Sequence, residues 1–368
     1  METQFFLPHL SLQQLFTVLK DKGYLCIAPT VKGTSIVYGP LNDSTKLPWE
    51  YSDTQGPGTY ELVKNKNDNG RAFDWSNGPS SIKPFLFKQQ EVLWRVNKDE
   101  NGRLSFQSEI ETEPQALIGV RPCDITAMIV QDKVFLEDEH VDIRYQNRRS
   151  TLFTVVVNCS YSSENCFCVA MGYGPKAEQG FDLAMTELDD GFVVQAGSEN
   201  GRELLQELDL KQASETQITF SNNRIMHAEK TQSREIPSPM GLRKGLLTEQ
   251  YHPRWDMIED RCTSCGSCTQ VCPTCFCHKE MEFPSLDGSG AEHLREWDSC
   301  FSENHSYIHG KVLRKDKKSR YRLWLSHKFV HWQKQYPVSS GCVGCGRCIT
   351  WCPVGIDVTE ELRELCNE

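Results

Sequence analysis

Two similar stretches decide how the C-terminal third of this chain folds: residues 261–275, RCTSCGSCTQVCPTC, and residues 341–355, GCVGCGRCITWCPVG. In each stretch three cysteines recur at every third position, and a fourth cysteine precedes a proline. This C-x2-C-x2-C-x3-C-P run is a ligand pattern of [4Fe-4S] clusters, and in proteins with two clusters the fourth cysteine of each run binds the other cluster. We therefore predict two such clusters in a helical, ferredoxin-like domain over residues 246–368.

The crossing of the fourth cysteines assigns the ligands of each cluster. One cluster is expected to bind Cys262, Cys265, Cys268 and Cys352. The other is expected to bind Cys342, Cys345, Cys348 and Cys272. Structural zinc is the alternative, but tetrahedral zinc sites use paired C-x2-C spacings and need neither a third cysteine nor the C-P ending. We therefore interpret these eight cysteines as iron ligands.

Four more cysteines fall in a segment whose pattern is that of an α/β layer. Residues 116–120, ALIGV, form a buried-strand run, a helix follows from residue 125, and residues 151–159, TLFTVVVNC, form a second strand. Each strand is followed by a cysteine at the end where α/β sheets build sites. The set is Cys123, Cys159, Cys166 and Cys168. Four thiolates suffice for a third [4Fe-4S] cluster. The alternative is four spare thiols, since free cysteine is often buried.

The remaining cysteines have less clear roles. Cys275, Cys277 and Cys300 lie near the first cluster motif, where they either line its pocket or supply a ligand to a centre shared between domains. Cys26 and Cys366 are isolated, and we expect no function for them. We find no defensible set of catalytic residues, because no Ser/His/Asp or paired-carboxylate arrangement is apparent.

The chain as a whole is predicted to have an α+β multidomain fold. Residues 1–105 form a mixed α/β region that opens with an amphipathic helix and ends with a hairpin turning at Asn101-Gly102. Residues 106–213 form the α/β domain, in which Asp124 is placed to cap the helix. Residues 214–245 are polar and irregular and are predicted to be a linker. The last domain contains a helix over residues 317–336 with an aromatic face.

The formal net charge of −10 argues against general affinity for nucleic acid, which needs a surplus of Lys and Arg. One basic run, residues 311–334, holds nine Lys or Arg residues among four aromatics, so a nucleic-acid patch has to be considered there. We favour a solvated helix face with an aromatic core stripe, followed by a docking surface for an acidic partner. No apolar run reaches the roughly 18 residues of a membrane span. With cysteines at metal-ligand spacings, a reducing, cytoplasmic location is expected.

Nearly end to end, the sequence resembles a family of iron–sulfur proteins. The segments that carry the resemblance are QGPGTYEL (55–62), GVRPCDI (119–125), NCFCVAMGYGP (165–175), RCTSCGSCTQVCPTCFC (261–277), WDSC (297–300), HKF (327–329) and GCVGCGRCITWCPVGID (341–357). The family comprises the beta subunits of cytoplasmic NAD(P)-linked [NiFe] hydrogenases (sulfhydrogenases), the corresponding iron–sulfur subunits of anaerobic sulfite reductases, and related electron-transfer subunits linked to heterodisulfide reductases.

The resemblance implies a non-catalytic relay subunit. It would pass single electrons between a flavin subunit that handles NAD(P)H and a second redox module, with a hydrogenase as first choice and a sulfite reductase or heterodisulfide reductase module as alternatives. The sequence is consistent with this role, because it contains no dinucleotide-binding or phosphate-binding motif of its own: no G-x-G-x-x-G follows a strand, and no phosphate-binding loop occurs. A cluster-containing nucleic-acid-binding or sensor protein is the alternative of another class, and a free-standing enzyme built around Cys123 is a third.

Overall fold

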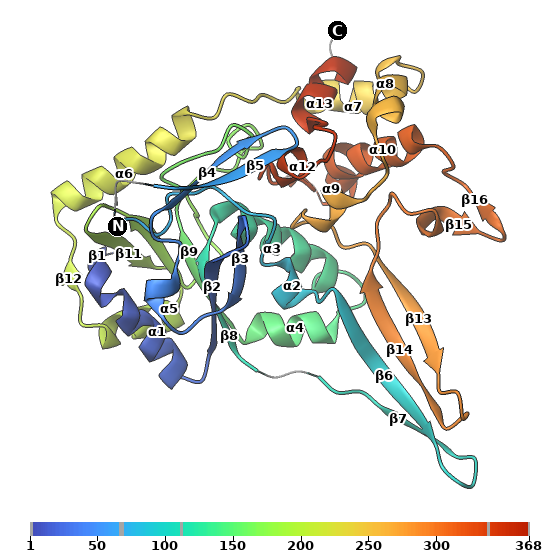
Figure 1. Cartoon of the computed structure of the whole chain (residues 1–368), viewed down its shortest axis with the longest axis horizontal. Coiled ribbons are helices and arrows are strands. Elements are labelled where there is room, and N and C mark those ends of the chain that lie inside the picture. Colours follow the sequence, from blue (N-terminus) through green and yellow to red (C-terminus); the bar gives the residue numbers. More distant parts are fainter. Residues whose placement is uncertain (1–2, 66–69, 111–112, 337–338, 367–368) are drawn as a thin grey trace.

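The computed structural model describes residues 3–65, 70–110, 113–336 and 339–366 (Figure 1). Within these ranges, eight strands form a mixed sheet in the order β12-β1-β11-β10-β9-β8-β2-β3. The strands are β1 (Phe5–Pro8), β2 (Leu25–Lys32), β3 (Ser35–Pro40), β8 (Gln115–Val120), β9 (Leu152–Val157), β10 (Leu183–Glu187), β11 (Gly191–Ala196) and β12 (Lys211–Gln212). The central strands β2, β8, β9 and β10 are parallel, and antiparallel strands flank them on both sides.

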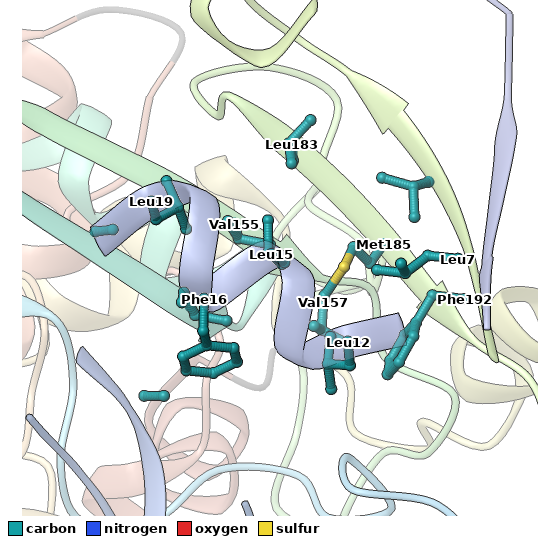
Figure 2. Close-up of a cluster of buried hydrophobic side chains, with 14 of the residues drawn as sticks. Leu7, Leu12, Leu15, Phe16, Leu19, Val155, Val157, Leu183, Met185 and Phe192 are labelled. Atoms are coloured by element: carbon teal, nitrogen blue, oxygen red, sulfur yellow. The ribbon is translucent and has the colours of Figure 1, made fainter. Parts of the chain in front are cut away.

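Successive side chains of the central strands point to opposite faces of this sheet, so the hydrophobic core is divided between the two faces. One face packs against α1 (Leu12–Asp21), whose buried stripe Leu12, Leu15, Phe16 and Leu19 meets Val155 and Val157 of β9 (Figure 2). Helix α5 (Glu199–Glu207) adds two leucines to that layer. The other face packs against α2 (Lys83–Leu86), α3 (Pro122–Phe135) and α4 (Ile143–Ser150). The predicted strand, helix, strand sequence after residue 115 is thus present.

A second sheet joins the two halves of the sequence. Its order is β13-β14-β6-β7, formed by β6 (Gln90–Lys98), β7 (Leu104–Gln107), β13 (His278–Pro284) and β14 (Gly290–Trp297). The hairpin predicted at Asn101-Gly102 is the β6–β7 pair. The β13–β14 hairpin lies inside the predicted helical domain and pairs with β6 (Figure 1). Buried Glu91 of β6 fixes this junction, because it forms ion pairs with Arg148 and Arg295.

The C-terminal third is otherwise mainly helical. Its elements are α7 (Pro239–Leu247), α8 (Arg254–Arg261), α9 (Ser267–Gln270), α10 (Lys317–Ser326), the π-helical segment η4 (His327–His331), α11 (Trp332–Gln335), α12 (Arg347–Thr350) and α13 (Val358–Cys366). The predicted aromatic face is confirmed, since Tyr321, Trp324, Phe329 and Trp332 are all buried. Two short hairpins complete the fold, β4 (Tyr51–Gly56) with β5 (Thr59–Lys64) and β15 (Tyr307–Ile308) with β16 (Lys311–Val312).

Three expectations about local structure are wrong. The segment 214–245 is not an irregular linker throughout, because α6 (Glu215–Lys230) occupies half of it and starts at a capping box formed by Ser214 and Gln217. The boundary near residue 105 does not separate two folds, since β1, β2 and β3 belong to the same sheet as β8. Asp124 makes no capping bond and is instead buried in an ion pair with Arg347.

Among the helices that the structure describes, none is long and apolar enough to cross a membrane.

Candidate iron–sulfur centres

The two cysteine runs adopt the same local fold. In each, a glycine in the left-handed region, Gly266 or Gly346 with φ 76°, precedes a four-residue helix, α9 or α12. A backbone N–H also points at the first sulfur of each run: Ser264 N lies 3.4 Å from Cys262 Sγ, and Gly344 N lies 3.4 Å from Cys342 Sγ. Such N–H···S contacts stabilise negative charge on a ligating sulfur. Both loops are therefore shaped to wrap an anionic group.

The first cavity is lined by all four cysteines predicted for one cluster, Cys262, Cys265, Cys268 and Cys352. Cys352 reaches this cavity from the second run, as the crossing pattern requires. Ile356 N donates to Cys352 Sγ at 3.3 Å. Phe301, Tyr321 and Trp324 supply apolar walls. The side chains present thus fit a cubane cluster shielded from water on its inner side.

The second cavity is lined by Cys272, Cys342, Cys345 and Cys348, the four cysteines predicted for the other cluster. Cys348 and Trp324 line both cavities, so the two sites adjoin. Lys328 of η4 also lines the second cavity. Its ammonium donates to Thr274 Oγ1 at 2.9 Å, and that hydroxyl lies 3.2 Å from Cys272 Sγ.

Burial controls the protonation of these thiols. It raises the pKa of Cys342 to about 12 and that of Cys345 to about 11, so both are neutral thiols unless a metal displaces the proton. Cys272 differs, because a hydrogen bond from the Cys275 thiol and the charge of Lys328 hold its pKa well below the usual value. Among the described residues, no three His, Cys, Asp or Glu side chains are placed to hold a single metal ion. Thiols spread around a cavity suit a multinuclear cluster better than zinc.

The α/β domain brings Cys123, Cys159, Cys166 and Cys168 to the carboxyl ends of β8 and β9, where the sequence predicted them. Hydroxyls of Ser76 and Ser163 lie 3.2 and 3.3 Å from Cys166 Sγ. The amide of Gln232 lies 3.3 Å from Cys168 Sγ. Burial raises the pKa of Cys159 to about 11, and the nearby Cys166 thiol adds to this shift, although Arg121 opposes it. The four thiols therefore share one polar, buried surrounding.

Arg121 is the unexpected member of this surrounding. Its side chain is 1% exposed, and its guanidinium lies 4.1 Å from the centre of the Trp75 ring. Its Nη2 donates to the carbonyls of Phe73 and Trp75. Its Nε and Nη1 have no hydrogen-bond partner within the part of the chain that the structure describes. The buried carboxyl groups of Asp53, Asp124 and Glu187 interact electrostatically with this cation, and an anion held by the four thiols would add to that compensation.

The third thiol set packs directly against the second cavity. Phe167 N donates to the carbonyl of Gly344 at 2.8 Å, so the loop that carries Cys166 and Cys168 lies on the second cysteine run. Arg347 and Asp124, both fully buried, form a two-pronged ion pair at 2.8 and 2.9 Å that ties α12 to α3. Cys123 and Cys345 belong to the same small hydrophobic cluster. All three thiol sets therefore form one contiguous region.

Sequence reasoning missed the buried cations of this region. Lys328, Lys83 and Arg121 are 4%, 3% and 1% exposed, although Lys and Arg are seldom buried without a partner. One feature of the sequence could have drawn attention to two of them, because Arg121 lies in the GVRPCDI segment and Lys328 lies in the HKF segment, both of which carry the family resemblance. Cys26 lies in the core of the large sheet and Cys366 lies in α13, both outside these thiol sets, as expected.

Comparison with known proteins identifies the C-terminal part first. Residues 261–356 match the 4Fe-4S dicluster domain family. Sulfhydrogenase 2 subunit beta of Pyrococcus furiosus is 28% identical over 350 residues, which cover 91% of this chain and 94% of that protein. The chain is a homologue of this sulfhydrogenase beta subunit. No solved structure matches it. The resemblance inferred from the motifs is thus confirmed, and this sulfhydrogenase beta homologue is an iron–sulfur electron-transfer subunit whose dicluster domain implies two [4Fe-4S] clusters.

Proposed function

We propose that this chain relays single electrons between a flavin subunit that handles NAD(P)H and a [NiFe] hydrogenase module. The observation that carries the proposal is the pair of adjoining cavities, which together are lined by all eight cysteines of the two runs. The name of the similar protein, a sulfhydrogenase beta subunit, favours a hydrogenase as the terminal module over a sulfite or heterodisulfide reductase.

The ligand sets of the two clusters are part of the proposal. Cys262, Cys265, Cys268 and Cys352 hold the cluster of the first cavity. Cys342, Cys345, Cys348 and Cys272 hold that of the second. When bound, each cluster supplies a centre that accepts and returns one electron. The chain holds the two centres next to each other, donates N–H bonds to the ligand sulfurs, and excludes water with the Tyr321 and Trp324 rings.

A third [4Fe-4S] cluster on Cys123, Cys159, Cys166 and Cys168 extends this relay into the α/β domain. Its support is the hydroxyl and amide groups around Cys166 and Cys168 and the unpartnered donors of Arg121 among the described residues. Its place beside the second cavity gives an electron path from the dicluster domain to the large sheet. The outer end of this path is then the docking face for the flavin subunit.

The relay is tested with Cys348→Ser in the intact complex. Cys348 is a proposed ligand of the cluster in the second cavity, so its replacement should remove about 4 iron atoms and abolish hydrogen-dependent reduction of NAD(P)⁺. The partial reactions, which are dye reduction by the hydrogenase and by the flavin subunit, should persist. Cys366→Ser is the matched control, because that thiol lies outside the cluster sets. Coupled activity that survives in Cys348→Ser would disprove the relay.

The third cluster has its own test. A Cys159→Ala/Cys166→Ala variant should contain about 4 iron and 4 sulfide fewer than the unaltered chain. Cys26→Ala, a buried cysteine in the sheet core, is the control for loss of a buried thiol. Equal iron in both variants would show that these four residues are ordinary buried thiols.

A further inference from the structure

The segment QGPGTYEL, residues 55–62, carries part of the family resemblance yet contains no cysteine. It forms the turn of the β4–β5 hairpin, in which Gly56 pairs with Thr59 across Pro57 and Gly58. In Figure 1 this hairpin reaches from the N-terminal half of the chain to α12, the short helix of the second cysteine run. A segment without iron ligands of its own therefore lies beside the dicluster domain.

The turn of this hairpin contacts the backbone around Cys352, the proposed ligand that crosses to the first cavity. Gly58 N donates to the carbonyl of Ile349 at 3.0 Å. A Cβ on Gly58, whose φ is 72°, would lie 2.9 Å from the carbonyl oxygen of Cys352 and 3.1 Å from Gly355 Cα. Gly355 has a φ of 63°, and a Cβ there would lie 3.2 Å from the carbonyl oxygen of Pro57. The two backbones thus meet at glycines, with no room for a side chain between them.

Two side chains of the hairpin hold the residues that precede Cys352. Thr350 Oγ1 donates to Gln55 Oε1 at 2.8 Å, and both side chains are buried. The Tyr60 ring stacks on the Trp351 ring, with 5.0 Å between the ring centres. The hairpin therefore contacts the second run through a hydrogen bond, an aromatic stack and the backbone of its turn.

These contacts matter because one short segment supplies ligands to both cavities. Cys348 of α12 is a proposed ligand of the second cavity, and Cys352, four residues later, is the proposed fourth ligand of the first. The three other ligands proposed for the first cavity lie in residues 262–268. Groups outside the ligand set have to hold a ligating side chain in place. For Cys352, the hairpin supplies such groups.

We propose that the β4–β5 hairpin positions Cys352, with Gly58 and Tyr60 as its positioning residues, and thereby secures the cluster of the first cavity. The inference rests on the ligand set proposed above. It gives the N-terminal half of the chain a role in the dicluster domain, although none of the ligands proposed for the two cavities lies in that half.

Gly58→Ala tests the backbone contact. The added Cβ would displace the carbonyl of Cys352, so the anaerobically reconstituted variant should hold about 4 iron and 4 sulfide fewer than the unaltered chain. The EPR spectrum of the reduced variant should retain the second cluster and lose the splitting that an adjoining reduced cluster causes. Gly33→Ala is the matched control, because Gly33 has a φ of 61° and open space around it. Full iron in Gly58→Ala, or equal loss from both cavities, would overturn the proposal.

Tyr60→Leu tests the aromatic contact without straining the backbone. The cluster of the first cavity should be held less firmly, so about 4 iron atoms should pass to a chelator several times faster than in the unaltered chain. The remaining iron should be released at the unaltered rate. Tyr60→Phe keeps the ring on Trp351 and should behave as the unaltered chain does. Equal release from Tyr60→Leu and Tyr60→Phe would contradict the positioning role.

Cys352→Ser separates this proposal from the ligand assignment on which it rests. As a proposed ligand, Cys352 should be needed for the first cluster even when the hairpin is intact, so this variant should lose about 4 iron. Iron loss in Cys352→Ser with full iron in Gly58→Ala would refute the positioning role alone. Full iron in both variants would refute the ligand set itself.

Discussion

Replacing Lys328 by methionine removes a buried positive charge beside the second cavity while keeping much of the side-chain volume. Lys328 is 4% exposed and donates to Thr274 and to the carbonyl of Gly341, without an ion pair to a carboxylate among the described residues. Burial alone would lower the pKa of Lys328, but Cys272, Cys275 and Cys342 hold it well above the usual value. Its charge therefore faces the cluster ligands.

The size of the effect follows from the bridge through Thr274. Distances of 2.9 and 3.2 Å along this bridge place the ammonium at most about 6 Å from Cys272 Sγ. A unit charge at about 6–8 Å, with an effective dielectric constant of about 20, contributes about 2–3 kcal/mol. For a one-electron couple this is on the order of 100 mV. A cation favours the more negative, reduced cluster, so Lys328→Met should lower the reduction potential.

EPR-monitored redox titration of the anaerobically purified chain measures this shift. Lys318→Met is the matched control, because it removes an equal charge from a lysine whose side chain is 43% exposed, where solvent screens it. Iron content has to match the unaltered protein, so that a potential rather than a loss of cluster is compared. A fully loaded Lys328→Met protein with an unshifted potential would refute the counter-charge argument.

Three further predictions concern stability and assembly. Arg347→Met should lower the free energy of unfolding by about 3–5 kcal/mol, measured by anaerobic denaturant titration, because it leaves Asp124 buried without a partner. Conversion of Asp124 to Asn in the same chain should recover part of the loss, and no recovery would contradict the ion-pair explanation. Gly344→Ala should lose iron, since its Cβ would lie 2.6 Å from Cys168 Cα at φ 69°, whereas Gly172→Ala, with φ 79° and open space around it, should retain iron. Burial raises the pKa of Glu187 from 4.5 to about 7, so the folded chain binds more protons than the unfolded chain between these values, and stability should fall as pH rises through this window. Glu187→Gln should remove that part of the pH dependence of thermal unfolding, and an unchanged profile would exclude Glu187 as its source.

Local signals in the sequence were sufficient for part of this structure. The two cysteine runs define their own loops, because spacing and glycine position are short-range features. The β6–β7 hairpin was predictable from its Asn-Gly turn, and α3 from its place between two apolar strands. The resemblance to sulfhydrogenase beta subunits also rested on short motifs, and comparison supports it.

Features that depend on distant partners were not predictable from one sequence. Strand β14 pairs with β6 almost 200 residues earlier, and the polar β13–β14 segment has no apolar face that would indicate a sheet. Helix α6 was missed because its composition is polar, although the capping box at Ser214 and Gln217 was visible. From the sequence alone, Lys83 would be assigned to the surface. In the structure its ammonium lies over the Trp297 ring, which is far away in sequence.

The shared second sheet makes the dicluster region an inseparable part of this chain rather than a detachable module. A fragment restricted to the dicluster match, residues 261–356, would present β14 as an exposed edge, and a fragment ending before it would expose β6 in the same way. Unpaired edges of this kind recruit other strands and promote aggregation. During synthesis, β6 has no β14 beside it until the hairpin at residues 278–297 has been made. We therefore expect chaperones to protect this strand edge during biogenesis.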